Sequence, residues 1–231
     1  MKKIMDGNEA CSYVSYNFTE VAGIYPITPA SPMAENVDKD SASGRLNFFG
    51  NRVNVVEMQS EAGAAGMVHG SLLAGALTTT YTASQGLLLM IPIMYKIAGE
   101  GLPLVINVAA RSLATHALSI MGDHQDIYAT RMTGFAILMN SSVQDIMDLT
   151  SVAHLSAISG HVPFINGFDG FRTSHELDKV ELIDLDKVKD LIDQKALNNF
   201  RNHGLNLDDP YTFGTSQMDD VYFQNTEARN T

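Results

Sequence analysis

The sequence predicts an α/β protein whose mostly parallel sheet has about six strands, with helices on both faces. Two observations carry this prediction. Short apolar runs alternate along the chain with longer segments whose apolar residues recur at helical spacing. The apolar runs show little polar alternation, as expected for strands that are covered on both faces of a parallel sheet.

Each element is assigned from its own residues. Strands are predicted at residues 21–24, 53–58, 77–82, 103–108, 134–139 and 161–165. The second run is rich in β-branched valine, the third in threonine, and the last three are predominantly apolar. Helices are predicted at residues 6–20, 33–40, 61–76, 85–98, 123–131 and 143–159, and after the last strand at 186–192 and 194–201.

A stiff loop follows the first predicted strand. Residues 25–32 read YPITPASP, and three prolines exclude both a helix interior and a central strand. Ser31 is predicted as the N-cap of the next helix and Pro32 as its first helical residue. Because open α/β sheets bind ligands beyond the carboxyl ends of their strands, this loop is a candidate site that fixes the hydroxyl of Thr28.

Composition narrows the class of protein. Fifteen basic and 26 acidic residues give a net charge of −11, so we expect neither nucleic acid nor an anionic membrane as a partner. Cys11 is the single cysteine, which excludes an intramolecular disulfide framework, a cysteine-based zinc site and an iron–sulfur cluster within this chain. The longest apolar run, residues 87–95, is too short for a membrane span, and no signal-peptide pattern opens the sequence. We therefore expect a cytoplasmic protein.

The last quarter of the chain differs from the rest. Residues 176–231 hold 12 acidic and 6 basic residues, a net charge of −6 out of −11. From residue 206 onward, polar residues, glycine, proline and aromatics follow one another without a period. We therefore expect one α/β domain at residues 1–203, with 204–231 as a linker or the start of a next domain in a chain that looks truncated.

Glu61 is the first candidate for chemistry. It follows a strand and begins a helix that also contains Gly63, Gly66, Gly70 and Gly75. Each glycine inside a helix costs about 1 kcal/mol relative to alanine, so a bare helix face that approaches another backbone or a flat ligand would explain them. The alternative is that Glu61 complements the helix dipole and that the glycines serve helix packing.

Arg111 is the second candidate, since it directly follows an apolar strand at the expected carboxyl edge of the sheet. An arginine there can form a bidentate pair with a small carboxylate. The alternative is an ion pair with one of the many acidic residues of the chain.

Residues 82–86 read TASQG and approximate the strand–turn–helix nucleophile elbow of hydrolases, with Thr82 in place of the first glycine. The nucleophile would be Ser84. The acid and the base would follow in chain order as Asp123 or Asp145 and then His161 or His175. The favoured interpretation is that Ser84 is the N-cap of the helix at 85–98.

Two further patterns give weaker evidence for a functional site. In GDHQD, residues 122–126, the spacing of Asp123, His124 and Asp126 matches no metal-ligand pattern, so we predict an acid-rich first helix turn and no metal site. The segment AGAAG after Glu61 is not the dinucleotide fingerprint, and the glutamate would repel a pyrophosphate at that helix N-terminus.

Long colinear stretches between residues 6 and 176 point to one family. They are DGNEA, YPITPASPMAE, VVEMQSEAGAAGMVHGSLLAGA, TYTASQGLLLMIPIMYKIAGE, ARSLATHALSIMGDHQDI, SSVQDIMDL and FDGFRTSHE, with YFQ near residue 222. Together they resemble the N-terminal domain of pyruvate:ferredoxin (flavodoxin) oxidoreductases. The resemblance covers nearly the whole chain.

The resemblance implies a thiamine diphosphate-dependent enzyme that cleaves pyruvate oxidatively with coenzyme A to acetyl-CoA and carbon dioxide. Its electrons pass through iron–sulfur clusters to ferredoxin or flavodoxin. The chain would be the pyrimidine-binding half of the thiamine site. Glu61 matches the glutamate that hydrogen-bonds N1′ of the aminopyrimidine, with Pro29 and Gly63 also at the cofactor. Thr28 and Arg111 match the substrate-binding residues, with Arg111 on the pyruvate carboxylate.

The chain also departs from the family pattern. It lacks the diphosphate-binding half, whose Gly-Asp-Gly and asparagine hold magnesium, and it lacks the cluster cysteines. The resemblance therefore places Mg²⁺ and the iron–sulfur clusters in the rest of the enzyme, makes those domains or subunits the partners, and implies that this chain alone is inert. An uncovered apolar face predicts self-association into a homo-oligomer. A close analogue such as 2-oxobutyrate stays open as the substrate.

A non-catalytic assembly or regulatory module of the same fold is the last alternative. A module without chemistry has no need of Thr28, Glu61 and Arg111 together, which argues against it.

Overall fold

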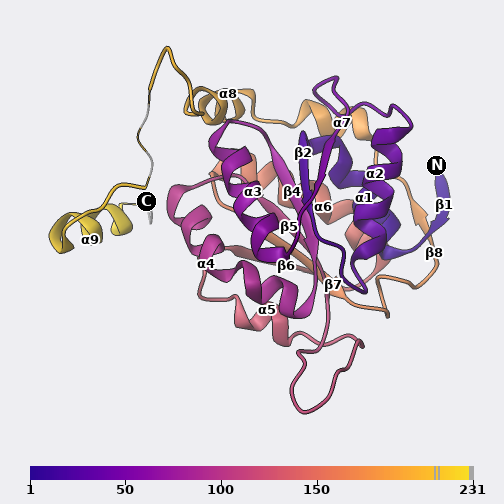
Figure 1. Cartoon of the computed structure of the whole chain (residues 1–231). Helices are drawn as coiled ribbons and strands as arrows, with labels where there is room; N and C mark the ends of the chain where they lie inside the picture. The colour runs from indigo at the N-terminus through magenta and orange to yellow at the C-terminus, as the bar shows by residue number, and fades with distance from the viewer. Residues whose placement is uncertain (211, 213, 229–231) are drawn as a thin grey trace.

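A parallel six-stranded sheet forms the centre of the computed structural model, which describes residues 1–210, 212 and 214–228 (Figure 1). The strand order is β3-β2-β4-β5-β7-β6, and all five pairings are parallel. The strands are β2 (Val21–Ile24), β3 (Asn54–Glu57), β4 (Thr78–Thr82), β5 (Val105–Ala110), β6 (Ala136–Asn140) and β7 (Phe164–Asp169). All six predicted strands and the predicted fold class are confirmed.

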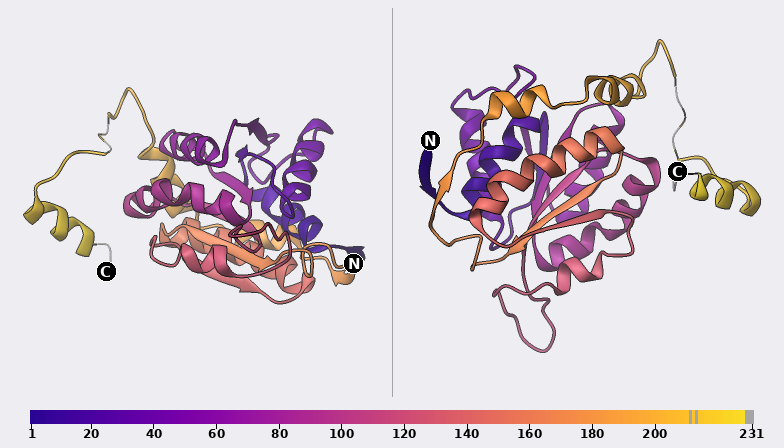
Figure 2. Two further views of the ribbon diagram at one scale, coloured as in Figure 1. Left: turned by 60° about the horizontal axis from the view of Figure 1, so that its bottom comes forward. Right: turned by 180° about the vertical axis from the view of Figure 1, so that it is seen from behind.

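Helices cover both faces of the sheet, in keeping with the complete burial of β4 and β5. On one face lie α1 (Gly7–Phe18), α2 (Ser31–Ala42) and α6 (Val143–Gly160). On the other lie α3 (Glu61–Leu73), α4 (Ser84–Glu100) and the short α5 (Gln125–Ala129). Figure 2 shows these layers from two further sides. One large cluster of buried residues spans both interfaces between helices and sheet, and a smaller cluster is formed by Val105, Ala153 and Ala157.

Two small strands lie outside the central sheet and were not predicted. β1 (Lys2–Met5) pairs antiparallel with β8 (Asp178–Glu181). Three of the four residues in each strand are exposed, and both strands carry charged side chains. Neither strand therefore shows an apolar run, and each depends on a partner far away in the sequence.

The chain after β8 first packs against the body and then leaves it. The predicted helices α7 (Leu185–Asp190) and α8 (Gln194–Asn202) are present, and Arg201 in α8 pairs with Glu20 at 2.9 Å. Beyond residue 206, where the sequence shows no period, the structure forms α9 (Asp219–Glu227), which has no buried residue and lies apart from the body in Figure 1. Tyr211 and Phe213, within the predicted linker, lie outside the described residues, and the division at residue 203 stays a prediction.

Two predicted helix caps are wrong. The N-cap of α2 is Ala30 rather than Ser31, so Pro32 is the second helical residue. The backbone N–H groups of Ala30 and Ser31 both bond to the carbonyl of Ile27, so the chain has already turned before Ser31 and its hydroxyl is not needed as a cap.

In α4 the N-cap is Ala83, not Ser84, and Ala83 has no side chain that could form a capping hydrogen bond. Among the described residues, no helix is long and apolar enough to cross a membrane.

Candidate functional site

Glu61 lies at the N-terminus of α3, where β3 ends. The hydroxyl of Ser60 caps the helix by accepting from the backbone N–H of Gly63 at 3.0 Å. The Glu61 side chain is therefore not needed as a cap. Glu61 is 7% exposed, and its carboxylate takes part in no hydrogen bond within the described part of the chain. A buried carboxylate without partners is costly, so this group has unused capacity to accept a hydrogen bond.

The carboxylate of Glu61 lies over bare backbone at Gly86, in the first turn of α4. A Cβ at Gly86 would stand 2.8 Å from Glu61 Oε1 and 2.6 Å from Thr82 Oγ1. Thr82 Oγ1 is itself buried without a hydrogen-bond partner. The close approach predicted for the glycines of α3 is thus found at a glycine of α4. Sequence analysis did not single out Gly86 as a point of close approach, although the glycine that ends the TASQG segment was the available signal.

The glycines of α3 do not share a close contact. A Cβ at Gly66 or Gly70 would meet nothing within 4 Å in this chain, and Gly75 lies after the helix at φ +82°. The bare face of α3 at Gly66 and Gly70 is therefore exposed here.

Arg111 follows β5 directly and is also 7% exposed. Its Nη1 donates to the carbonyl of Thr28 at 2.7 Å and its Nη2 to Gln85 Oε1 at 3.2 Å, while Nε is buried without a partner. Burial lowers the pKa of Arg111, and the charges of Asp126 and Glu61 oppose that shift. The predicted alternative of an ion pair is not seen for Arg111 in the described residues.

The proline-rich loop is held in place from two sides. The carbonyl of Pro29 accepts a hydrogen bond from Asn8 Nδ2 at 2.9 Å, and Gly170 allows close contact with the Pro29 ring. Thr28 is exposed, whereas Pro29 is buried, and the peptide bond between them is cis. The structure thus brings Thr28 and Arg111 together, as the position of both residues after strands predicts.

Asp126 joins the carboxyl ends of β4 and β5. Its Oδ2 accepts the backbone N–H groups of Ser84 at 2.7 Å and Arg111 at 3.0 Å, and its Oδ1 accepts that of Ile127 at 2.7 Å. The side chain is fully buried, which raises the pKa of Asp126, while the three N–H donors act in the opposite direction. Sequence analysis placed this residue in an acidic first helix turn and missed its contacts. No cluster of metal-ligating side chains occurs in the described ranges.

The match to a protein-family model decides the relationship. Residues 13–231 match the family described as pyruvate flavodoxin/ferredoxin oxidoreductase, thiamine diphosphate-binding. The chain belongs to this family. The resemblance inferred from the sequence is therefore confirmed.

Relatives within this oxidoreductase family are much longer than the chain. It is 61% identical to a pyruvate-flavodoxin oxidoreductase of Klebsiella pneumoniae over 99% of its own length and 20% of the relative's. It is 59% identical to a pyruvate:ferredoxin oxidoreductase of Moorella thermoacetica, with the same coverage of each chain. The chain thus spans about a fifth of the length of these curated relatives.

A solved structure of a 2-oxoglutarate:ferredoxin oxidoreductase from Magnetococcus marinus has the same fold. The TM-score is 0.70 at 19% identity, over 80% of this chain and 32% of that one.

The geometry does not support the alternative of a serine hydrolase centre at Ser84. The hydroxyl of Ser84 is buried and donates to the carbonyl of Ser112 at 2.6 Å. The predicted partners are engaged elsewhere: Asp145 accepts from Ser141, His161 ends α6, and His175 contacts Ser174 and Phe171. Within the described residues, none of the four predicted acids and bases bonds to Ser84.

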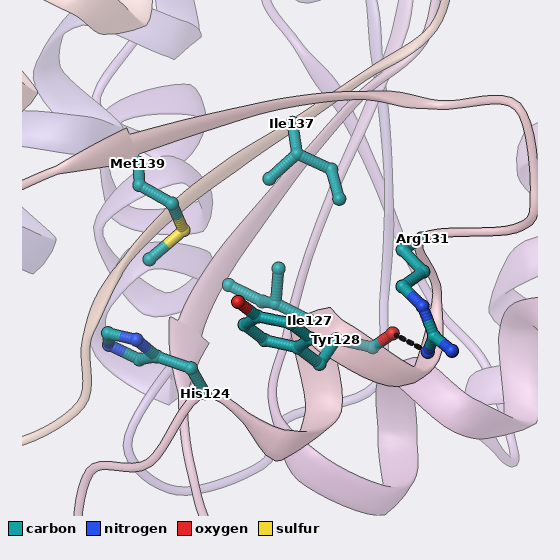
Figure 3. Close-up of a pocket in the computed structure, with 6 residues that line it drawn as sticks. All are labelled: His124, Ile127, Tyr128, Arg131, Ile137 and Met139. Carbon is teal, nitrogen blue, oxygen red and sulfur yellow. Dashed lines mark hydrogen bonds between the residues drawn. The ribbon is translucent and has the colours of Figure 1, made fainter.

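Two surface hollows lie beside the edge strand β6 of this oxidoreductase domain. One, of about 250 Å³, is apolar and is lined by His124, Ile127, Tyr128, Arg131, Ile137 and Met139 (Figure 3). A second, of about 330 Å³, is more polar and shares His124 and Met139 with the first. Neither hollow is lined by Glu61 or Arg111. The exposed side chains of Tyr128, Ile137 and Met139 leave an apolar patch on this edge.

Proposed function

We propose that this chain is the pyrimidine-binding half of the thiamine diphosphate site in a pyruvate:ferredoxin or flavodoxin oxidoreductase. The overall reaction converts pyruvate and coenzyme A to acetyl-CoA and carbon dioxide and reduces the acceptor protein. The observation that carries the proposal is the buried Glu61 carboxylate, which has no hydrogen bond in the described structure and lies over the bare backbone of Gly86.

These residues fit a flat, nitrogen-containing ring. Glu61 offers a hydrogen-bonding oxygen to N1′ of the aminopyrimidine, and we also assign Gly63, in the first turn of α3, and Pro29, in the proline-rich loop, to the cofactor. Thr82 Oγ1, buried and unpartnered, supplies a second polar group at the same place. When bound, thiamine diphosphate supplies the nucleophilic carbon that attacks the carbonyl of a 2-oxoacid.

Residues of this chain take two further roles, which are proton sharing with the cofactor and binding of the substrate carboxylate. Glu61 holds the proton that it shares with N1′, a role that suits a carboxyl group shielded from water. Arg111 binds the substrate carboxylate with the N–H groups that Thr28 and Gln85 leave free. Thr28 is exposed and its backbone carbonyl accepts from that guanidinium, so we assign its hydroxyl as a second donor to the same carboxylate.

The rest of the machinery belongs to other parts of the enzyme. The diphosphate-binding half with its Mg²⁺ and the domain that holds the iron–sulfur clusters would be the partners, in keeping with relatives about five times as long. On its own the chain would be inert, because it offers only one side of the cofactor site. We expect a cytoplasmic homo-oligomer that accepts pyruvate or a closely related 2-oxoacid.

The test is substitution of Glu61 in the full-length enzyme. Glu61→Ala is expected to lower pyruvate-dependent acceptor reduction at least about 100-fold, because the shared proton loses its carrier. Glu57→Gln, an exposed glutamate at the end of β3, is the matched control and should keep the original rate. Undiminished turnover in Glu61→Ala would remove the proposal.

A further inference from the structure

The turn between β4 and α4, residues 82–86, contacts both candidate residues of the proposed site. Gln85 accepts a hydrogen bond from Arg111 Nη2 at 3.2 Å. One residue later, Gly86 leaves room for the Glu61 carboxylate, and Thr82 borders the same space. The position of the arginine relative to the glutamate therefore depends on the conformation of this turn.

The turn has an unusual backbone. Ser84 has φ +52°, in the left-handed region that residues with a Cβ rarely adopt. Such a conformation persists only where neighbouring contacts hold it. Two contacts do so here: the backbone N–H of Ser84 donates to Asp126 Oδ2 at 2.7 Å, and its hydroxyl donates to the Ser112 carbonyl at 2.6 Å.

The same carboxylate oxygen of Asp126, Oδ2, also holds the backbone of Arg111. Oδ2 accepts the backbone N–H of Arg111 at 3.0 Å, so one atom joins the residue that begins α4 to the residue that follows β5. Because the Asp126 side chain is fully buried, water does not compete for these bonds. Hydrogen bonds and the covalent chain thus connect Asp126 through Ser84 and Gln85 to the guanidinium of Arg111.

We propose that Asp126 is a positioning residue for the reaction, which sets the place of the Arg111 guanidinium through the Ser84–Gln85 turn and so fixes where the substrate carboxylate binds. Asp126 contacts neither substrate nor cofactor in this scheme. The proposal rests on the proposed function in one respect, the assignment of Arg111 to the substrate carboxylate.

The experiment compares three variants of the full-length enzyme. Asp126→Asn cannot present acceptor oxygens to all three N–H donors, since one carboxylate oxygen becomes an NH₂ group. Gln85→Leu leaves every bond of Asp126 intact and removes the side-chain oxygen that accepts from Arg111 Nη2 and from the Ser84 hydroxyl, which keeps the Ser112 carbonyl as its other acceptor. Asp123→Asn is the matched control, because this partly exposed aspartate, three residues earlier, accepts only the N–H of Gln125.

The readouts separate positioning from a loss of structure. Asp126→Asn and Gln85→Leu should each raise the KM for pyruvate about tenfold with a smaller change in kcat, since a misplaced guanidinium weakens ground-state binding. The dissociation constant of thiamine diphosphate, measured by calorimetry on the apoenzyme, should stay within about twofold of the original. Hydrogen exchange should quicken at the amides of Ser84 and Arg111 in Asp126→Asn, and Asp123→Asn should match the original enzyme throughout.

Two outcomes overturn the proposal. An unchanged KM for pyruvate in both variants would show that neither residue positions Arg111. Equal losses in kcat, substrate affinity and cofactor affinity would show a structural role only. The variant Arg111→Met distinguishes a failure of the positioning proposal from a failure of the proposed function. If Arg111→Met leaves the KM unchanged, the carboxylate assignment itself fails; if it raises the KM while the other variants do not, only the positioning role fails.

Discussion

Two layers of buried polar residues lie against this sheet, and they are built in different ways. Beneath α1 and α6 the polar side chains are neutral and bond to one another. Asn166 donates to Asn107 and to Thr150, each at 2.9 Å, and the Ser15 and Tyr81 hydroxyls meet at 2.9 Å. Burial raises the pKa of Cys11, whose thiol donates to Asn107, to about 12, so that thiol stays neutral.

At the carboxyl edge of the sheet the polar residues are charged and incompletely paired. Glu61 has no hydrogen bond among the described residues, Arg111 Nε has no partner, and Thr82 Oγ1 is buried and alone. Some atoms of the neutral layer, such as Asn107 Nδ2 and His154 Nε2, are also buried without a partner among the described residues, so the two layers differ in charge rather than in completeness. Burying a charged group with spare hydrogen-bonding capacity costs more than burying a neutral one, so the charged edge is the place where a ligand is expected. Variants in the two layers should therefore affect different measurements.

The largest effect is expected from Gly86→Ala. The new methyl group would stand 2.6 Å from Thr82 Oγ1 and 2.8 Å from Glu61 Oε1, so the carboxylate must move. In the full-length enzyme we expect kcat/KM for pyruvate to fall about 100-fold, the size of effect that a misplacement near 1 Å produces. The control is Gly99→Ala in the same helix, where a Cβ meets nothing within 4 Å. An active Gly86→Ala enzyme would show that the position of Glu61 does not matter.

The opposite result is expected in the neutral layer. Asn166→Leu removes the hydrogen bonds to Asn107 and Thr150 and leaves their groups buried. The free energy of unfolding of this chain, measured in urea, should fall by about 2–3 kcal/mol, while the KM for pyruvate in the full-length enzyme stays the same. Asn54→Ala on the exposed edge strand β3 should change the stability by less than about 0.5 kcal/mol. A large change in KM for Asn166→Leu would contradict the separation of the layers.

The contrast also explains what the sequence predicts well. The central strands are recognisable because burial on both faces produces continuous apolar runs, as in β5 with all six residues buried. Thr28, Glu61 and Arg111 each follow a strand, and parallel strands bring their carboxyl ends to one edge, so their proximity follows from the fold class.

The partners of these residues do not follow from local pattern. Asp126 reaches Ser84 and Arg111 across 42 and 15 residues of sequence, and Gln85 accepts from Arg111 across 26 residues. Such contacts depend on where α5 packs, which no periodicity records. β1 and β8 were missed for a related reason, since long-range pairing rather than an apolar pattern makes them strands.

A pH effect is expected from His154, which belongs to the neutral layer. Its ring stacks on Phe18 at 4.8 Å, and burial lowers its pKa from 6.5 to about 3. The folded protein therefore keeps His154 neutral, while the unfolded chain binds a proton below pH 6.5. Stability is full above that pH and declines as the pH falls toward 3, by about 2 kcal/mol at pH 5.

Urea unfolding of this chain at pH 7.5 and pH 5 measures that contribution. His154→Phe retains an aromatic ring for the stack and should lose about 2 kcal/mol less than the original between the two pH values. His116→Gln, at an exposed histidine in the loop before α5, should keep the full pH dependence. Identical pH dependence in His154→Phe and the original chain would mean that His154 is not held neutral.

The smallest effect is expected at the exposed glycines of α3, and it tests whether another part of the full-length enzyme covers this helix face. Gly66 and Gly70 meet nothing within 4 Å, so Gly70→Ala in this chain should raise the free energy of unfolding by up to about 1 kcal/mol through helix propensity alone. Helix propensity cannot explain why glycine stands there, whereas a covering surface from the further domains proposed above can, and the curated relatives are about five times as long as this chain. In the full-length enzyme we therefore expect the same substitution to lower the thermal midpoint, because the methyl group enters a close contact. Equal stabilisation in both contexts would leave the α3 face uncovered and would make its glycines unnecessary to the assembled enzyme.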